Sequence, residues 1–219
     1  MPTLTQDGPV WTLDLGADEN RFTLAALDEV EQHLGTVSGS AEPAALVTTG
    51  SGKFFSNGLD LEWLGSNPDG IGDYVARVQQ VLSAFLTLPV PTVAAVNGHA
   101  FGAGAMLAMA HDVRVMRADR GYFCFPEVDI HIPFTAGMAA LIQGKLTPAA
   151  AVEAMTTGRR YAGPEALERG LVDDVADLDA LTTTASARVR DLAGKDRATL
   201  GAIKATMFAP AVEALGRGA

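Results

Sequence analysis

Two glycine-rich turns hold the residues of this sequence whose types and spacing could do chemistry. The first runs from Gly50 to Leu61 and the second from Asn97 to Met106, and each follows an apolar run and precedes an expected helix. Small residues let a ligand come close to the main chain, and free N–H groups at a helix start attract negative charge. Ligands bind at the carboxyl ends of parallel strands, so the two turns indicate a site that holds negative charge through main-chain groups.

The sequence lacks the residue spacings of known nucleotide-binding and metal-binding motifs. The segment Gly102–Gly104 supplies only the start of the dinucleotide fingerprint, because Leu107 stands where its third glycine belongs. Lys53 is followed by Phe54 rather than by a hydroxyl residue, so there is no P-loop. No group of His, Cys and Asp residues has metal-ligand spacing, and we expect neither a metal nor a separate cofactor.

The possible side-chain nucleophiles also lack a suitable context. Cys124 lies between two phenylalanines, which is typical of a core residue. Ser51 and Ser56 have no nucleophile-elbow sequence around them. These patterns favour a site without a covalent nucleophile.

The elements that must position the two turns alternate along the first two thirds of the chain. Hydrophobic periodicity predicts strands at 10–15, 44–49, 92–96 and 113–116, and helices at 24–34 and 74–86. This order predicts βαβ units and a largely parallel sheet, an α/β fold. Helical patterns then dominate, at 148–156, 164–169, 178–192 and 197–207, with one strand at 171–175. We therefore divide the chain into a core, residues 1–145, and a mainly helical region, residues 146–219, of the same functional unit.

Composition narrows the classes of partner. The chain has 219 residues, 48% of them hydrophobic, which suits one compact domain, and a net charge of −10. This acidic balance argues against nucleic acid or an anionic membrane as a partner. The apolar stretch 90–110 is interrupted by Pro91, Asn97 and Gly98, so buried elements explain it better than a membrane helix. A single cysteine and no evident targeting segment favour the cytoplasm.

Four motifs in this order resemble those of the crotonase (enoyl-CoA hydratase/isomerase) superfamily. They lie at residues 53–61, 91–104, 157–161 and 165–173, and the resemblance runs from near residue 10 to near residue 207. It implies a crotonase-like ββα spiral core with a C-terminal helical oligomerisation region, assembled as a homotrimer or a dimer of trimers. It also implies that the substrate is an acyl thioester of coenzyme A, so that coenzyme A belongs to the substrate.

The resemblance further implies an oxyanion hole for the thioester oxygen. It assigns the two donors to the main-chain N–H groups of Asn57 and Ala103, which would stabilise the negative charge of an enolate. It also implies substrate contacts along both turns, at Ser56, Gly58, Leu59, Asp60, Leu61, Gly102 and Met106.

The choice of reaction depends on the carboxylates. Enoyl-CoA hydratases have two glutamates, one after the second oxyanion turn and one in the following Pro-Glu segment, and water addition uses both. By this resemblance Met106 stands at the first position and Glu127 at the second. A single acid/base can move a proton from C2 to C4 of a 3-enoyl thioester. The resemblance therefore favours a Δ3,Δ2-enoyl-CoA isomerase with Glu127 as its catalytic residue, and segment 120–130 is similar to that of monofunctional plant isomerases.

Alternatives remain open for the function and for single residues. One alternative is hydration or another crotonase reaction on an acyl-CoA, and another is a non-catalytic acyl-CoA-binding homologue. Asp60 fits a helix-start charge. The cations Arg21, Lys53 and Lys204 could pair with phosphates of coenzyme A, although solvation at the surface is their default. His131 stands where the family usually has glycine, and its bulk could narrow the acyl pocket.

Overall fold

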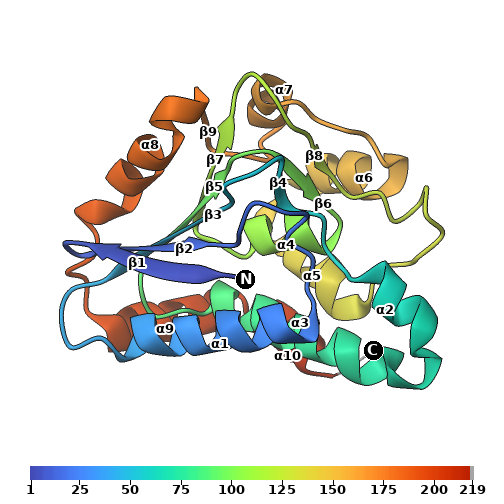
Figure 1. The fold of residues 1–219 in the computed structure, drawn as a ribbon, viewed down its shortest axis with the longest axis horizontal. Coiled ribbons are helices and arrows are strands. Elements are labelled where there is room, and N and C mark those ends of the chain that lie inside the picture. The colour runs from blue at the N-terminus through green and yellow to red at the C-terminus, as the bar shows by residue number, and fades with distance from the viewer. Residues whose placement is uncertain (218–219) are drawn as a thin grey trace.

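A computed structural model describes residues 1–217 and contains two β-sheets with helices around them (Figure 1). The larger sheet has the order β1-β2-β3-β5-β7-β9 and the smaller one β4-β6-β8. Apart from the antiparallel pair β1–β2, neighbouring strands run parallel, as the alternating pattern predicts. The strands are β1 (Thr3–Asp7), β2 (Val10–Asp14), β3 (Ala45–Thr49), β4 (Phe54–Ser56), β5 (Thr92–Val96), β6 (His99–Phe101), β7 (Val113–Arg117), β8 (Phe123–Cys124) and β9 (Asp174–Ala176).

The chain visits the two sheets alternately and so forms a spiral of ββα coils. Each coil has one strand in the large sheet, one in the small sheet and then helix: β3 and β4, β5 and β6, β7 and β8. The first coil closes with α2 (Leu61–Ser66) and α3 (Ile71–Leu86), the second with α4 (Ala103–Met109) and the third with α5 (Ala136–Lys145). The carboxyl ends of β4, β6 and β8 therefore meet along one edge of the small sheet.

The large sheet is covered on both faces. On one face Val47, Val93 and Val115 pack with α8 (Leu178–Arg190). On the other face a larger core includes buried side chains of α1 (Leu24–Gly39), α3 and α4. The helices α1, α3, α9 (Arg197–Met207) and α10 (Ala209–Gly216) lie on the side of the sheet opposite α8 in Figure 1. Burial on both faces explains why the strands read as continuous apolar runs rather than alternating ones.

Successive coils approach one another at main-chain distance. A Cβ atom at Gly98 would lie 2.1 Å from the carbonyl oxygen of Lys53, and one at Gly104 would lie 2.2 Å from that of Ser56. Both positions therefore require glycine. The side chain of Asn97, 3% exposed, fastens the same turns, because it accepts from the N–H of Gly50 at 2.9 Å and donates to the carbonyl of Gly52 at 2.9 Å.

Two features of the fold were not predicted. The strands of the small sheet are two or three residues long, too short for hydrophobic periodicity, and the strand β1 and the helices α5 and α10 were also missed. The strand expected at 171–175 lies at Asp174–Ala176 and joins the edge of the large sheet beside β7. Region 146–217 is otherwise helical, with α6 (Pro148–Thr157), α7 (Gly163–Glu168), α8, α9 and α10, and residues 218–219 of the predicted region lie outside the described residues.

The helix α10 packs against helices from the first two thirds of the chain. It packs against α3 and α5, and Leu215 on α10 is 1% exposed. A Cβ atom at Gly137 on α5 would lie 2.6 Å from the Cα of Leu215, so the two helices touch through their main chains. The buried surface of α3 and α5 is thus completed by residues from the end of the chain.

Candidate active site

A pocket of about 240 Å³ opens at the edge where β4, β6 and β8 end. The pairing of Ser56 with Ala100 and of Phe101 with Cys124 brings the three strand ends together. The pocket is lined by Arg21, Asn57, Leu59, Leu61, Phe101, Gly102, Ala103, Pro126, Glu127, Ile130, Ile132 and Arg160. Both glycine-rich turns and the Pro-Glu segment therefore contribute to one cavity.

Glu127 supplies the carboxylate of this pocket. Its residue is 8% exposed, and its Oε2 atom is buried without a hydrogen-bond partner among the described residues. Burial raises the pKa of Glu127 from its ordinary value of 4.5 to about 7, because desolvation disfavours the charged form. A carboxyl group with this pKa can both take and return a proton near neutral pH. The turn that carries it is closed by hydrogen bonds from Asp129 and Ile130 to the carbonyl of Pro126, at 2.9 and 3.0 Å.

Gly102 connects β6 to α4 directly beside this carboxylate. Its φ of 54° and ψ of −123° belong to a region that only glycine adopts readily. A Cβ atom there would lie 3.4 Å from Oε1 of Glu127. The positive φ therefore requires glycine at this turn, and the carboxylate lies within van der Waals distance of the place where a side chain would begin.

Among the residues that line the pocket, Leu59 and Ala103 have N–H groups without a hydrogen-bond partner in the described part of the chain, and each lies on one of the two glycine-rich turns. The carbonyl of Gly58 accepts from the N–H of Phe22 at 2.9 Å, and a trans peptide places the next N–H on the opposite side. The N–H of Leu59 consequently points away from Phe22. The carbonyl of Gly102 likewise accepts the first helical bond of α4, from Met106 at 3.0 Å, so the N–H of Ala103 points out of the helix start.

The predicted donor at Asn57 is contradicted by the hydrogen bonds. The N–H of Asn57 already donates to the carbonyl oxygen of Glu19 at 2.8 Å, so it is not free for a ligand. Leu59, predicted only as a substrate contact, has the free N–H two residues later. The segment 19–22 causes this difference, because it hydrogen-bonds to the N–H of Asn57 and the carbonyl of Gly58 and leaves the N–H of Leu59 without a partner among the described residues.

The remaining predicted site residues divide between pocket and support. Leu61 and Gly102 line the pocket, whereas Ser56 is fully buried and its hydroxyl donates to the carbonyl of Asn20 at 2.7 Å. The carboxylate of Asp60 accepts from the N–H of Trp63 at 3.1 Å and caps α2, which confirms the helix-start interpretation.

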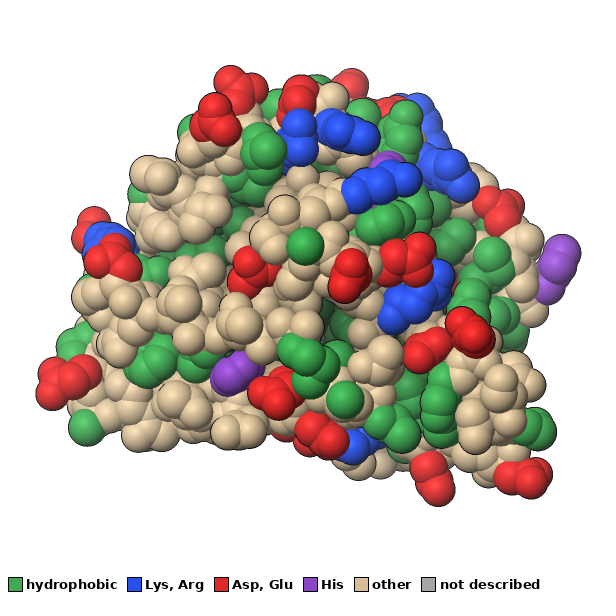
Figure 2. All heavy atoms as spheres, in the orientation of Figure 1, with side chains coloured by type: hydrophobic (Ala, Val, Ile, Leu, Met, Phe, Trp, Pro, Cys, Tyr) green, Lys and Arg blue, Asp and Glu red, His purple; other side chains and the backbone are tan. Residues whose placement is uncertain are grey.

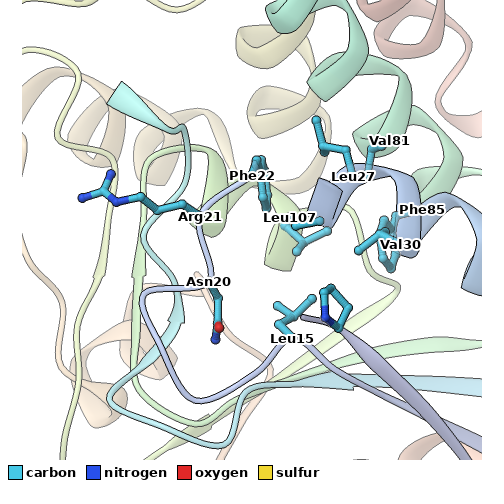
Figure 3. Close-up of a pocket in the computed structure, with 11 residues that line it drawn as sticks. Leu15, Asn20, Arg21, Phe22, Leu27, Val30, Val81, Phe85 and Leu107 are labelled. Carbon is cyan, nitrogen blue, oxygen red and sulfur yellow. The ribbon is translucent and has the colours of Figure 1, made fainter. Parts of the chain in front are cut away.

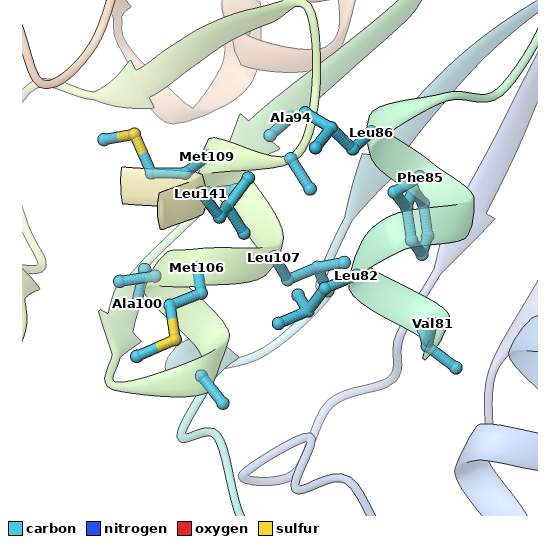
Figure 4. Packing of buried hydrophobic residues seen from close by; sticks show 14 of the residues in the cluster. Val81, Leu82, Phe85, Leu86, Ala94, Ala100, Met106, Leu107, Met109 and Leu141 are labelled. Carbon is cyan, nitrogen blue, oxygen red and sulfur yellow. The ribbon is translucent and has the colours of Figure 1, made fainter. Parts of the chain in front are cut away.

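Met106 is 1% exposed and lies beside Ala100 in the packed core (Figure 4). Neither Met106 nor Gly58 is among the residues that line the pocket. A contact of either residue with the substrate stays a prediction.

The cations considered as phosphate partners lie in different places. Arg21 lines the pocket, pairs with Glu19 at 2.6 Å and donates to the carbonyl of Leu59 at 3.0 Å. Lys53 is exposed over the ring of Phe54. Lys204 was expected at the surface, but it is 4% exposed and pairs with Asp112 at 2.6 Å.

Sequence reasoning missed Arg160, whose guanidinium lies 5.6 Å from the centre of the Phe101 ring at the pocket wall. Its position within the motif 157–161 was the available signal. His131 has a φ of 58°, which explains the family preference for glycine, but it is exposed and is not among the residues lining the pocket.

The described residues also form a small cavity and charged surfaces, but no metal site and no helix that could cross a membrane. A small apolar cavity, shown in Figure 3, has about 20 Å³, roughly the space of one water molecule. Acidic side chains lie around the visible face of the molecule, and several Lys and Arg side chains gather in its upper part (Figure 2). Within residues 1–217, no group of His, Cys, Asp and Glu could hold a metal ion, and no helix is long and apolar enough to cross a membrane.

Known proteins are similar to this chain in sequence and in fold. The profile of the family described as Enoyl-CoA hydratase/isomerase matches residues 10–218. Enoyl-CoA delta isomerase 3 of Arabidopsis thaliana is 41% identical over 186 residues, which cover 80% of this chain and 77% of that protein. The peroxisomal enoyl-CoA delta isomerase 2 of the same plant is 40% identical over 188 residues, with the same coverage. A probable enoyl-CoA hydratase of Mycobacterium tuberculosis superposes with a TM-score of 0.89 at 24% identity, covering 98% of this chain and 91% of that one.

The ββα coils, which place strands in two sheets, and the pocket at the edge of the small sheet define an α/β enzyme of the crotonase fold, which confirms the predicted fold class. The chain belongs to the enoyl-CoA hydratase/isomerase family, within the crotonase superfamily and close to the Δ3,Δ2-enoyl-CoA isomerases.

Proposed function

We propose that this enzyme moves the double bond of a 3-enoyl-CoA to give the 2-enoyl-CoA. The observation that carries the proposal is the single buried carboxylate, Glu127, in a pocket walled by two free main-chain N–H groups. Buried Met106 stands where a hydratase would need its second carboxylate. The enoyl-CoA delta isomerases that the chain resembles, at 40–41% identity, support the same reaction.

The reaction balances with these groups alone. The carboxylate of Glu127 takes a proton from C2, the electron pair of that C–H bond forms a double bond between C1 and C2, and the π pair of the carbonyl moves to the thioester oxygen. The N–H groups of Leu59 and Ala103 stabilise this enolate, and losing one such donor typically costs about 10²–10³ in rate. The carboxyl group then returns its proton to C4, the C3–C4 double bond becomes C2–C3, and the enzyme regains its carboxylate.

The test is to supply 3-enoyl-CoA and 2-enoyl-CoA in separate reactions. We expect the first to yield the conjugated thioester, followed by its ultraviolet absorption, and the second to yield little hydroxyacyl-CoA by chromatography. Glu127→Gln should lower isomerase turnover by roughly 10²–10⁴-fold, the usual contribution of a general acid/base, and leave binding of an acyl-CoA unchanged. Rapid hydration of the 2-enoyl-CoA, or full turnover by Glu127→Gln, would overturn the proposal.

The family resemblance also supports proposals for the substrate and the assembly. We infer an acyl-CoA as substrate and a homotrimer or dimer of trimers as the assembly, and light scattering of the purified chain tests the latter. A cytoplasmic location stays a prediction, and the relative named peroxisomal makes the organelle the alternative outcome of a localisation experiment.

A further inference from the structure

The hydroxyl group of Tyr74 joins two segments of the site without lining its pocket. Tyr74 lies on α3 and is 2% exposed. Its hydroxyl donates to the carbonyl of Phe22 at 2.8 Å and accepts from the N–H of Asp60 at 2.9 Å. Burial raises the pKa of Tyr74 to about 12, so the group stays protonated and able to donate at neutral pH.

These bonds are part of a closed ring around Leu59. The N–H of Phe22 donates to the carbonyl of Gly58 at 2.9 Å, while the carbonyl of Phe22 receives the Tyr74 hydroxyl. Both peptide units that flank Leu59 are therefore held: the one before it by Phe22, and the one after it by Tyr74 and by Arg21, which donates to the Leu59 carbonyl at 3.0 Å. The N–H that no group holds is that of Leu59 itself.

The ring is attached to the core on both sides. The side chain of Phe22 is 6% exposed and lies beside Leu107 in Figure 3, and both residues line the small apolar cavity. The ring of Tyr74 packs against Trp63, with 5.1 Å between centroids. Movement of the Leu59 peptide would thus require a buried aromatic side chain to shift or a buried polar group to lose its partner.

We propose that Tyr74 is a positioning residue for the oxyanion hole: its hydroxyl, through Asp60 and Phe22, orients the main chain so that the N–H of Leu59 points into the pocket. The inference rests on the proposed function, because it assigns the thioester oxygen as the acceptor. Tyr74 itself touches neither the pocket nor Glu127.

The size of the effect follows from what Tyr74→Phe removes. The variant leaves the N–H of Asp60 and the carbonyl of Phe22 without their partner, but the bond between Phe22 and Gly58 remains. The donor at Leu59 is then misdirected rather than lost. We expect kcat to fall by about tenfold to a hundredfold, less than the roughly 10²–10³ for losing a donor, with KM within about threefold.

A spectroscopic measurement separates positioning from a general structural effect. The carbonyl stretching frequency of a saturated acyl-CoA, labelled with ¹³C at the thioester carbon, is compared free and bound to each protein. The matched control is Tyr161→Phe, because Tyr161 is also buried, at 1% exposure, and does not line the pocket. We expect the same lowering of the frequency for the unaltered enzyme and the control, and a smaller lowering for Tyr74→Phe.

An equal frequency shift and equal kcat in all three proteins would overturn the inference. If the shift depends on Tyr74 but the unaltered enzyme does not turn over 3-enoyl-CoA, the isomerase proposal fails and this inference stands. A second measurement needs no variant and serves if Tyr74→Phe does not fold. By amide hydrogen exchange, the N–H of Asp60 should exchange slowly, and that of Leu59 should exchange fast until an acyl-CoA binds; fast exchange at Asp60 would refute the ring.

Discussion

The burial of Glu127 should destabilise the folded protein in a manner that depends on pH. An acid whose pKa is higher in the folded chain than in the unfolded chain binds more protons when folded, so stability falls as the pH rises between the two values. For Glu127 this window runs from its ordinary 4.5 to about 7. At about 1.4 kcal/mol per pH unit, the ionised carboxylate costs about 3 kcal/mol above pH 7.

Replacing Glu127 with glutamine removes this cost, since the amide has a similar shape and no charge to desolvate. Urea unfolding of both proteins at several pH values between 4 and 8.5 measures the difference in their free energies of unfolding. We expect that difference to shift by about 3 kcal/mol in favour of Glu127→Gln between the two ends of the range. Any constant contribution from the new amide cancels, because only the change with pH is compared.

The control is Asp129→Asn, which makes the same chemical change two residues along the same turn at an exposed carboxylate. Parallel stability curves for the unaltered enzyme and Glu127→Gln would refute the reasoning, because they would show that the Glu127 carboxylate is not desolvated. In that case the pKa near 7 and the role as proton carrier would lose their physical basis.

Three further outcomes are expected. With Glu127 acting first as a base, kcat/KM should rise about tenfold per pH unit up to about pH 7 and then level off, and a profile flat down to pH 5 would contradict this assignment. Gly102→Ala should lower stability by about 1–3 kcal/mol and reduce turnover, because φ is 54° and its Cβ would meet Glu127, whereas Gly65→Ala in open space on α2 should be neutral or stabilising by thermal unfolding. Lys204→Met should cost about 2–4 kcal/mol in urea unfolding, a little below a fully buried pair because Asp112 is 30% exposed, and should leave kcat unchanged.

The sequence predicts most of the large sheet because its strands are buried on both faces. Runs such as 92–96 are mostly apolar and end at glycine or asparagine, so their type and limits can be recognised. The small sheet leaves no such signal, since two or three residues cannot show a period. It is nevertheless this sheet that brings the three parts of the site together, and only the resemblance to a family anticipated their meeting.

The oxyanion donors show a different limit. Asn57 and Leu59 lie two residues apart in the same turn, and nothing in their side chains distinguishes the free N–H from the bonded one. Hydrogen bonds to Glu19 and Phe22 determine which N–H group stays free. These residues lie far earlier in the chain than the turn, as the separation of 38 residues between Arg21 and Leu59 shows. A main-chain donor can be located only when its hydrogen-bond partners elsewhere in the fold are known.

The packing of α10 against α3 and α5 bears on how the chain is made. Each coil offers its backbone as the surface on which the next one stacks, so the spiral can assemble in the order in which a ribosome releases it. The contact between Gly137 and Leu215 cannot form until residues 209–216 have been synthesised. Until then the part of α3 and α5 that α10 covers is open to water. The docking of α10 is therefore a late step of folding during synthesis, and it covers the apolar surface of α3 and α5 against which it packs.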